Sequence, residues 1–468
     1  MNAELREIVE KAKKQYGQVE LKNINGRFYL YKVTSKYDPQ KKQTRKISGT
    51  YIGKVTAQGI IQAKTRERTI YEYANAKLLK TLLNDVVENL RTYFPDEWQE
   101  LAAYSIVRTI RNVPIKYVKE AWDKLYLSDE IEASLSRNTL SDKLRNVGAD
   151  WDAQHQFFLS LMRDQNVFFY DVSSIFSRSV NLNLAEKGYN KEHQFLDQIN
   201  FALLFSQERK TPVMLKSMPG SIRDIKSLKA FMTEFPLKDC ILVLDRGFQS
   251  APVEEDLVSL DAKFVQPLRR NSKLIDYSLQ TPTLFKYRDR GIKYGRKELK
   301  IGDSRATLFL YEDVLLRGEE HSNLIKLKLE HGDQIAIDER SLGKISILTN
   351  LDQSGEKVYC LYKEREDVEQ AFDAMKNELE NDKSYLGDDD AVRGYFFVSF
   401  LSLYLYFRVL ELIRSADMVG EVSVEELLFK LSSVYLIKYR SGKERLSEVP
   451  SKVQKLLADL RLNLLPKI

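Results

Sequence analysis

Three acidic residues of this 468-residue chain stand where they could bind a divalent cation together. Asp171 follows the apolar and aromatic run in "VFFYDVSS", and Asp245 ends the run in "CILVLDRGF". A single strand-end aspartate most often caps the next turn or helix. A carboxylate at the rim of a buried sheet is costly to desolvate unless a cation or donor lies near it. With Glu369, the chain offers three carboxylates from separate elements, a donor set that suits Mg2+.

The segment "YKEREDVEQAFDAMK", from Tyr362 to Lys376, is predicted to be one helix that carries the third carboxylate. Its apolar residues recur at the spacing of a buried helical stripe. They are Val368, Phe372 and Met375, followed by Leu379. Arg365 and Glu369 share a narrow sector beside this stripe with Tyr362 and Lys376. The helix therefore presents a phenol, a guanidinium, a carboxylate and an ammonium along one edge.

This edge has two interpretations. If it faces a metal site, Glu369 is a ligand. Arg365 and Lys376 then bind phosphates, and Tyr362 offers a phenol or a stacking face. If the edge is solvated, Arg365 and Glu369 form a surface salt bridge worth roughly a few tenths of a kcal/mol. Neighbouring acids also leave the choice of ligand open on chemistry alone: Glu364, Glu366 and Asp367.

The first interpretation points to phosphodiester chemistry. A pair of Mg2+ ions can activate an attacking oxygen and stabilise the leaving oxygen of an in-line phosphoryl displacement. The sequence therefore favours a metal-dependent enzyme of phosphoryl transfer.

The spacing Tyr362-x2-Arg365-x3-Glu369-x6-Lys376 resembles the Y-(2)-R-(3)-E-(6)-K signature of a cut-and-paste group of bacterial insertion-sequence DDE transposases. "YDVSS" is similar to the first-aspartate strand of that group, "PGSIRD" to the segment before its middle helix, and "LDRGF" to its second-aspartate turn. Flanking segments at both ends are similar as well, so the resemblance covers most of the chain.

The resemblance implies a ribonuclease-H-like catalytic domain that uses two Mg2+ ions, for which Mn2+ can substitute. Asp171, Asp245 and Glu369 match the metal ligands. The matching DNA-end contacts are Tyr362, Arg365 and Lys376, with Arg246 as a weaker candidate. The implied partners are double-stranded DNA, namely the terminal inverted repeats of a mobile element and its target DNA, and a second subunit in a homodimer.

Part of the family pattern is absent. Some relatives place an insertion-domain tryptophan against a flipped base when they close a DNA hairpin. All three tryptophans here precede Asp171, so a phenylalanine or tyrosine of the insertion would have to take that role, for instance Tyr287 or Tyr294.

The expected fold class is α/β, with the catalytic domain interrupted by a β-rich insertion and preceded by a β meander and a helical DNA-binding region. "LSRNTLSDKLRNVG" has the features of a short recognition helix, although a packing helix with a solvated edge fits it equally well. The predicted boundaries are 1–65 for the basic DNA-binding meander, 66–163 for the helical DNA-binding region, 164–279 with 351–415 for the catalytic domain, 280–350 for the insertion, and 416–468 for a helical region that could dimerise.

Charge and composition limit the class of protein. Residues 1–80 hold 18 Lys and Arg against 7 Asp and Glu, so this end suits a polyanion. Two cysteines and four histidines argue against a disulfide scaffold or a Cys/His zinc cluster. The apolar run Tyr395–Phe407 is short for a membrane span and is expected to be a core helix. With no export signal in the charged first residues, we expect a cytoplasmic, nucleoid-associated bacterial protein without membrane contact.

Two other functions stay open. A catalytically inactive, transposase-derived DNA-binding regulator would bind the same DNA ends, but the presence of all three carboxylates weighs against it. Another ribonuclease-H-like nuclease, directed at RNA, would share the aspartates. The Tyr/Arg/Lys edge and the basic amino-terminal region weigh against that alternative.

Overall fold

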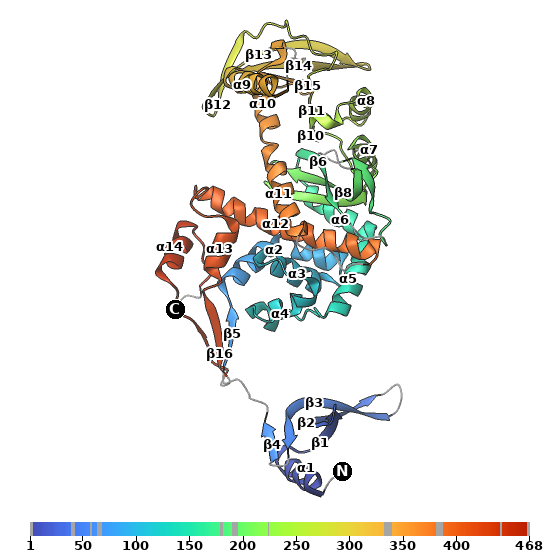
Figure 1. The fold of residues 1–468 in the computed structure, drawn as a ribbon, viewed down its shortest axis with the longest axis vertical. Helices are drawn as coiled ribbons and strands as arrows, with labels where there is room; N and C mark the ends of the chain where they lie inside the picture. The colour runs from blue at the N-terminus through green and yellow to red at the C-terminus, as the bar shows by residue number, and fades with distance from the viewer. Residues whose placement is uncertain are drawn as a thin grey trace. The chain divides into compact units, whose positions relative to one another are not determined.

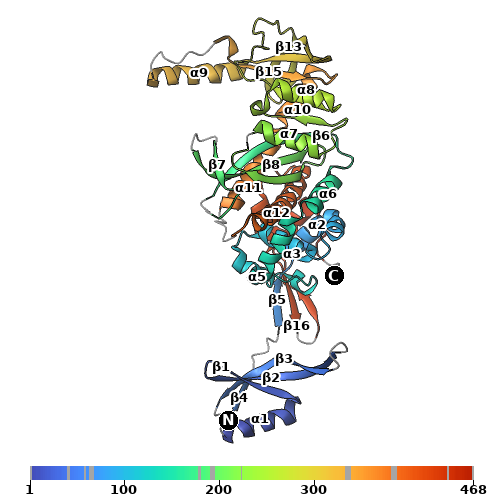
Figure 2. The same cartoon turned by 90° about the vertical axis from the view of Figure 1, so that its right-hand side faces the viewer.

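The computed structural model describes residues 3–38, 43–56, 59–62, 68–177, 181–189, 195–222, 224–331, 339–380, 387–439 and 442–465 (Figures 1 and 2). The chain divides into two compact units. The first comprises Met1–Ile70 with Ile437–Arg445, and the second comprises Tyr71–Leu436 with Leu446–Ile468.

The first unit is a four-stranded sheet with one helix. Strands β1 (Val19–Ile24), β2 (Arg27–Asp38), β3 (Gln43–Thr56) and β4 (Gly59–Gln62) pair in chain order, all antiparallel. Asn25 and Gly26 make the first hairpin turn with positive φ angles of 51° and 77°, as an Asn-Gly turn requires. Helix α1 (Ala3–Tyr16) packs its apolar side on this sheet. The meander was therefore predicted from the sequence, whereas α1 was not.

A three-stranded sheet joins segments that are distant in the sequence. Its order is β17 (Glu444–Leu446), β16 (Tyr435–Tyr439) and β5 (Arg68–Glu72). The sequence had predicted helical structure over 66–163 and 416–468, so these strands correct that prediction. Each strand is too short to show a period of its own, and each depends on partners far away in the chain.

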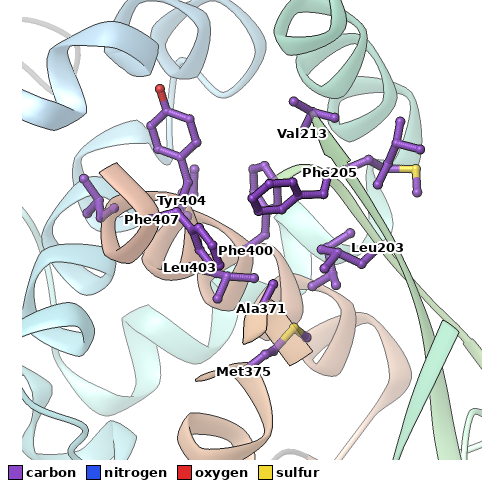
Figure 3. Packing of buried hydrophobic residues seen from close by; sticks show 14 of the residues in the cluster. Leu203, Phe205, Val213, Ala371, Met375, Phe400, Leu403, Tyr404 and Phe407 are labelled. Carbon is purple, nitrogen blue, oxygen red and sulfur yellow. The ribbon is translucent and has the colours of Figure 1, made fainter. Parts of the chain in front are cut away.

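The core of the second unit forms around α12 (Asp389–Ser415), which lies between the large sheet and a group of helices (Figure 1). The helices are α2 (Ala74–Tyr93), α3 (Trp98–Ile110), α4 (Val118–Trp122), α5 (Arg137–Ala149) and α6 (Trp151–Met162), followed after α12 by α13 (Val424–Leu431) and α14 (Ser451–Asp459). Figure 3 shows buried side chains of α12 beside those of the sheet, where the ring of Phe407 lies 4.9 Å from that of Phe205. The apolar stretch of α12 is long enough to span a membrane, but 78% of it is buried inside the fold, as a core helix would be.

The predicted recognition helix, α5, packs closely on α12. A Cβ atom added to Gly148 would lie 1.7 Å from the Asp390 carbonyl oxygen, and one added to Gly394 would lie 1.9 Å from that of Leu144. Two cations of α5 are already in ion pairs, Lys143 with Glu97 and Arg145 with Asp388. These contacts favour the packing interpretation of α5 over base recognition.

The large sheet contains ten strands. They are β6 (Val167–Phe176), β7 (Glu186–Tyr189), β8 (Phe195–Ser206), β9 (Thr211–Pro219), β10 (Ile241–Val243), β11 (Lys263–Pro267), β12 (Thr283–Tyr287), β13 (Arg290–Ile301), β14 (Ser304–Asp313) and β15 (Lys344–Thr349). Their order is β12-β13-β14-β15-β11-β10-β6-β8-β7, with β9 also paired to β8. β10 runs parallel to β6 and β11, and the other pairs are antiparallel. Helix α7 (Asp224–Glu234) precedes β10, and α8 (Ala251–Ser259) follows it.

The segment predicted as a β-rich insertion also contains a helix. β12 to β14 and β15 are present, but α9 (Val314–His331) occupies the 18 residues after β14. β15 pairs with β11, so the strands of this segment extend the main sheet and do not form a separate one. The sequence prediction that residues 280–350 consist of strands is thus wrong for α9.

Candidate active site

Two of the predicted carboxylates come from the neighbouring parallel strands β6 and β10. Asp171 lies within β6, which continues to Phe176, so the expectation that this strand ends at Asp171 is wrong, whereas Asp245 does follow the end of β10. β6 and β10 are in register, with Val243 opposite Phe169. Asp245 and Asp171 each follow two residues later, so they lie at the same level of the sheet. Asp171 is buried, with 6% of its surface exposed, and its Oδ1 accepts a hydrogen bond from the backbone N–H of Val172 at 2.8 Å. Asp245 stands at the start of the short turn Arg246–Phe248.

The third carboxylate comes from a helix that the sequence predicted as continuous. The structure has two helices, α10 (Gly355–Lys363) and α11 (Glu366–Glu380), which follow one another along the chain (Figure 1). Tyr362 lies in the last turn of α10 and Glu369 in the first turn of α11, so the prediction of a single helix is wrong at Glu364 and Arg365.

Tertiary contacts hold this break from two sides. The chain tightens into i→i+3 hydrogen bonds, from Arg365 N–H to the Tyr362 carbonyl at 3.3 Å and from Val368 N–H to the Arg365 carbonyl at 3.0 Å. The Glu364 carboxylate accepts a hydrogen bond from Lys210 at 3.0 Å. Arg365 turns toward the sheet instead. Consecutive side chains are therefore fixed in different directions.

The guanidinium of Arg365 contacts all three predicted carboxylates. Its Nη1 lies 3.2 Å from Asp171 Oδ2. Its Nη2 lies 3.4 Å from Asp245 Oδ1 and 2.5 Å from Glu369 Oε1. The side chain of Arg365 is only 12% exposed. The predicted Arg365–Glu369 salt bridge is thus present, but within a largely buried cluster and not on a solvated edge.

The charges of this cluster explain the pKa of Arg365. Burial opposes the charged guanidinium and is the largest single influence, but attraction by Asp245, Asp171 and Glu369 together outweighs it and raises the pKa. Arg365 is therefore charged at every physiological pH. Three carboxylates around one guanidinium leave an excess of negative charge, which favours a further cation.

The residue types at this site fit Mg2+, because three hard oxygen donors arrive from separate elements. Among the described residues, no three His, Cys, Asp or Glu side chains lie close enough to hold one ion as they stand. The carboxylates here surround a guanidinium, which is larger than a Mg2+ ion with ligand distances of about 2.0–2.1 Å. Binding of Mg2+ between them requires Arg365 to move aside and the oxygens to close in.

The remaining predicted site residues have different environments. Tyr362 is half-buried against the core. Arg246 follows Asp245, and its Nε is buried without a hydrogen-bond partner in the part of the chain that the structure describes. Lys376 belongs to α11, but its side chain lies outside the described residues.

Sequence reasoning missed the residues that hold the Asp245 turn. Gln266 of β11 donates a hydrogen bond to the Asp245 carbonyl at 2.8 Å. Arg269 donates to the carbonyl oxygens of Arg246 and Gly247 at 3.3 and 3.2 Å. The adjacent strand "KFVQPLRR" was the available signal, since a glutamine within an otherwise apolar strand needs a partner.

The β12–β13 turn reaches the edge of the site. Arg288 forms an ion pair at 3.2 Å with Glu366, the first residue of α11. Tyr287 beside it is partly exposed. Tyr294 packs against Phe285, Phe309 and the backbone of Gly355. Of the two tyrosines suggested for base stacking, only Tyr287 lies beside the α11 contact.

Residues 170–405, half of the chain, match the family model described as the Transposase DDE domain. The chain belongs to the DDE transposases. All three carboxylates and Arg365 fall within the transposase domain. No curated protein matches this transposase. Among solved structures, it is similar to a piggyBac transposase synaptic complex with hairpin DNA, determined by cryo-electron microscopy, with a TM-score of 0.39, 11% identity, and coverage of 78% of this chain and 82% of that chain.

Proposed function

We propose that this DDE transposase binds the terminal inverted repeats of its mobile element, cuts the ends by Mg2+-dependent hydrolysis and joins the 3′ ends to target DNA. The supporting observation is the convergence of Asp171, Asp245 and Glu369 on Arg365. We place it in the bacterial insertion-sequence group with the Y-(2)-R-(3)-E-(6)-K signature, as a cytoplasmic protein.

The three carboxylates would hold two Mg2+ ions, or Mn2+ in their place. When bound, the ions supply activation of the attacking oxygen and stabilisation of the leaving oxygen. Arg365 would leave the carboxylates and bind a DNA phosphate, for which its planar fork of donors is suited. Gln266 and Arg269 keep the Asp245 turn in place during this exchange.

The topology supports a ribonuclease-H-like catalytic domain. The antiparallel strands β6, β8 and β9 lead through α7 to β10 and then through α8 to β11, which are parallel to β6. Residues 280–350 enter between the second aspartate and the glutamate, where the resemblance places the insertion. We propose that the basic amino-terminal region binds the inverted repeats and that two subunits bring two ends together.

The test is cleavage of a labelled duplex taken from the DNA that flanks the reading frame. Asp171→Asn, Asp245→Asn and Glu369→Gln should each abolish cleavage in Mg2+ or Mn2+ while binding to the duplex persists. Asp373→Asn is a matched control, because Asp373 is exposed on α11 one turn from Glu369. Full cleavage by any of the three variants would remove that residue from the site.

The same assay separates the alternatives. A wild-type chain that binds the ends but never cuts them would be an inactive regulator. A chain that cuts RNA or scrambled DNA as well as the element ends would be another nuclease of this fold.

A further inference from the structure

The amino-terminal sheet has one covered and one open face. Helix α1 lies along one side of the strands (Figure 2), where Val9 and Ala12 pack against Leu30 and Val55. Adjacent residues of a strand point to opposite faces, and paired residues on neighbouring strands point to the same face. The residues that precede and follow Leu30 along β2, together with their partners on β1 and β3, therefore lie on the face that α1 does not cover.

That open face carries three tyrosines close together. The rings of Tyr31 and Tyr51 have centroids 5.3 Å apart, and those of Tyr29 and Tyr51 are 6.1 Å apart. The register explains the grouping, because Tyr31 pairs with Tyr51 across β2 and β3. Tyr51 is 37% exposed. We call Tyr29, Tyr31 and Tyr51 the tyrosine face.

Lysines lie among these rings. The Nζ of Lys22 is 5.0 Å from the centre of the Tyr31 ring, and Lys54 pairs with Tyr29 across the sheet. The acidic residue Glu20 pairs with Tyr31 and so lies on this face too. Positive charge thus accompanies the tyrosine face, within the most basic part of the chain.

The phenol of Tyr51 is neutral at physiological pH. Burial, followed by the neighbouring Tyr29 and Tyr31, raises the pKa of Tyr51 above its usual value. A neutral ring can accept a base on its face without repelling the phosphate next to it.

We propose that the tyrosine face binds unpaired nucleotides of a DNA strand, with bases stacked on the rings and phosphates bound by Lys22 and Lys54. Bases within a duplex are already stacked on each other and expose only their edges, which Arg, Asn and Gln side chains read. Rings interleaved with lysines suit a single strand instead, because every base has a face that can stack. The inference rests on the proposed function only in taking DNA as the bound polymer.

The test measures binding by the full-length chain, using fluorescence anisotropy with a labelled oligothymidine and with a labelled duplex of the element end. Tyr51→Ala and Tyr29→Ala should each weaken oligothymidine binding at least about fivefold, the lower limit for losing one stacked base. Tyr51→Phe should bind as the wild type does, since the ring remains. Duplex binding should fall much less than oligothymidine binding in the two alanine variants, and not at all in Tyr51→Phe.

A matched control is Tyr117→Ala. Tyr117 is 51% exposed and has Lys116 4.7 Å from its ring centre, but it lies outside the tyrosine face. Its removal should leave oligothymidine binding unchanged. Lys22→Gln and Lys54→Gln should each flatten the dependence of affinity on salt, whereas the tyrosine variants should not.

Several results would overturn the inference. They are unchanged binding by the alanine variants, an equal loss in the phenylalanine variant or in the Tyr117 control, and an equal loss for duplex and single strand. Circular dichroism melts would show whether a variant is folded, and Tyr51→Phe provides an independent reading. Because the assay needs no cleavage, an inactive metal site would not affect it, and failure here would leave the proposed function untouched.

Discussion

Removing Arg365 should destabilise the transposase domain in a way that Mg2+ reverses. Arg365→Ala leaves Asp171, with a side chain only 9% exposed, without its cation. Breaking a buried pair by removing one partner costs about 3–5 kcal/mol. Asp245 and Glu369 are 34% and 58% exposed, so water can hydrate both carboxylates in the variant. Losing each of their contacts with Arg365 therefore costs less than about 1 kcal/mol.

We therefore expect a loss of about 3 kcal/mol at pH 8 in the presence of a chelator. A thermal midpoint shifts by about 2–4 °C per kcal/mol in domains of 150–250 residues, so the drop should be several degrees. A cation that binds only the folded state raises the midpoint. Because the guanidinium no longer competes for the carboxylates, Mg2+ should raise the midpoint of the variant more than that of the wild type.

The assay is differential scanning fluorimetry across Mg2+ concentrations, with Arg414→Ala as the matched control. Arg414 of α12 pairs with Asp367 of α11 at 2.8 Å and does not contact the three carboxylates. Its variant should lose stability without any added response to Mg2+. Equal Mg2+ responses in wild type, Arg365→Ala and the control would refute competition between Arg365 and a metal ion.

Two further predictions concern α12, one its packing and one the residue that caps its first turn. Gly394→Ala should lower the thermal midpoint strongly, because its new Cβ would lie 1.9 Å from the Leu144 carbonyl oxygen. The control Gly318→Ala, in open space on α9, should raise stability by up to about 1 kcal/mol. Equal effects of the two variants in melting experiments would contradict this packing. Burial opposes the charge of Asp388, but hydrogen bonds from the backbone of Ala391 and from Arg145 outweigh it and lower the pKa below 3.8. The stability from this depressed pKa is present above pH 3.8 and lost as pH falls further. The melting temperature of Asp388→Asn should therefore be lower than that of the wild type at pH 7 and equal to it at strongly acidic pH. A constant difference in melting temperature across that range would contradict the assignment.

Much of the site was predictable because it depends on local patterns. Apolar runs followed by an acid placed Asp171 and Asp245 on buried strands, although only Asp245 follows the end of its strand, and helical periodicity placed Glu369 on a helix. The signature spacing selected Glu369 and Arg365 from the other charged residues of that segment. The strand pattern likewise predicted the amino-terminal meander.

The position of Arg365 could not be predicted in the same way. Residues 362–376 have an unbroken helical period, but the helix is interrupted where Arg365 contacts Asp171 and Asp245 and where Glu364 contacts Lys210. These partners are separated from Arg365 by more than a hundred residues of sequence. The same applies to β5 and β16, which are too short to show a pattern and depend on distant partners.

The most direct test of the central claim exchanges a proposed metal ligand for a softer one. Asp245 is 34% exposed, so a cysteine there would be accessible to ions. Thiolates bind Mg2+ poorly and softer cations well. Asp245→Cys should not cut element-end DNA in Mg2+ but should recover cleavage in Mn2+ or Cd2+, while Asp373→Cys should cut in Mg2+ as the wild type does. Full cleavage by Asp245→Cys in Mg2+, or no recovery with any softer cation although the variant still binds the DNA, would contradict the assignment of Asp245 as a metal ligand.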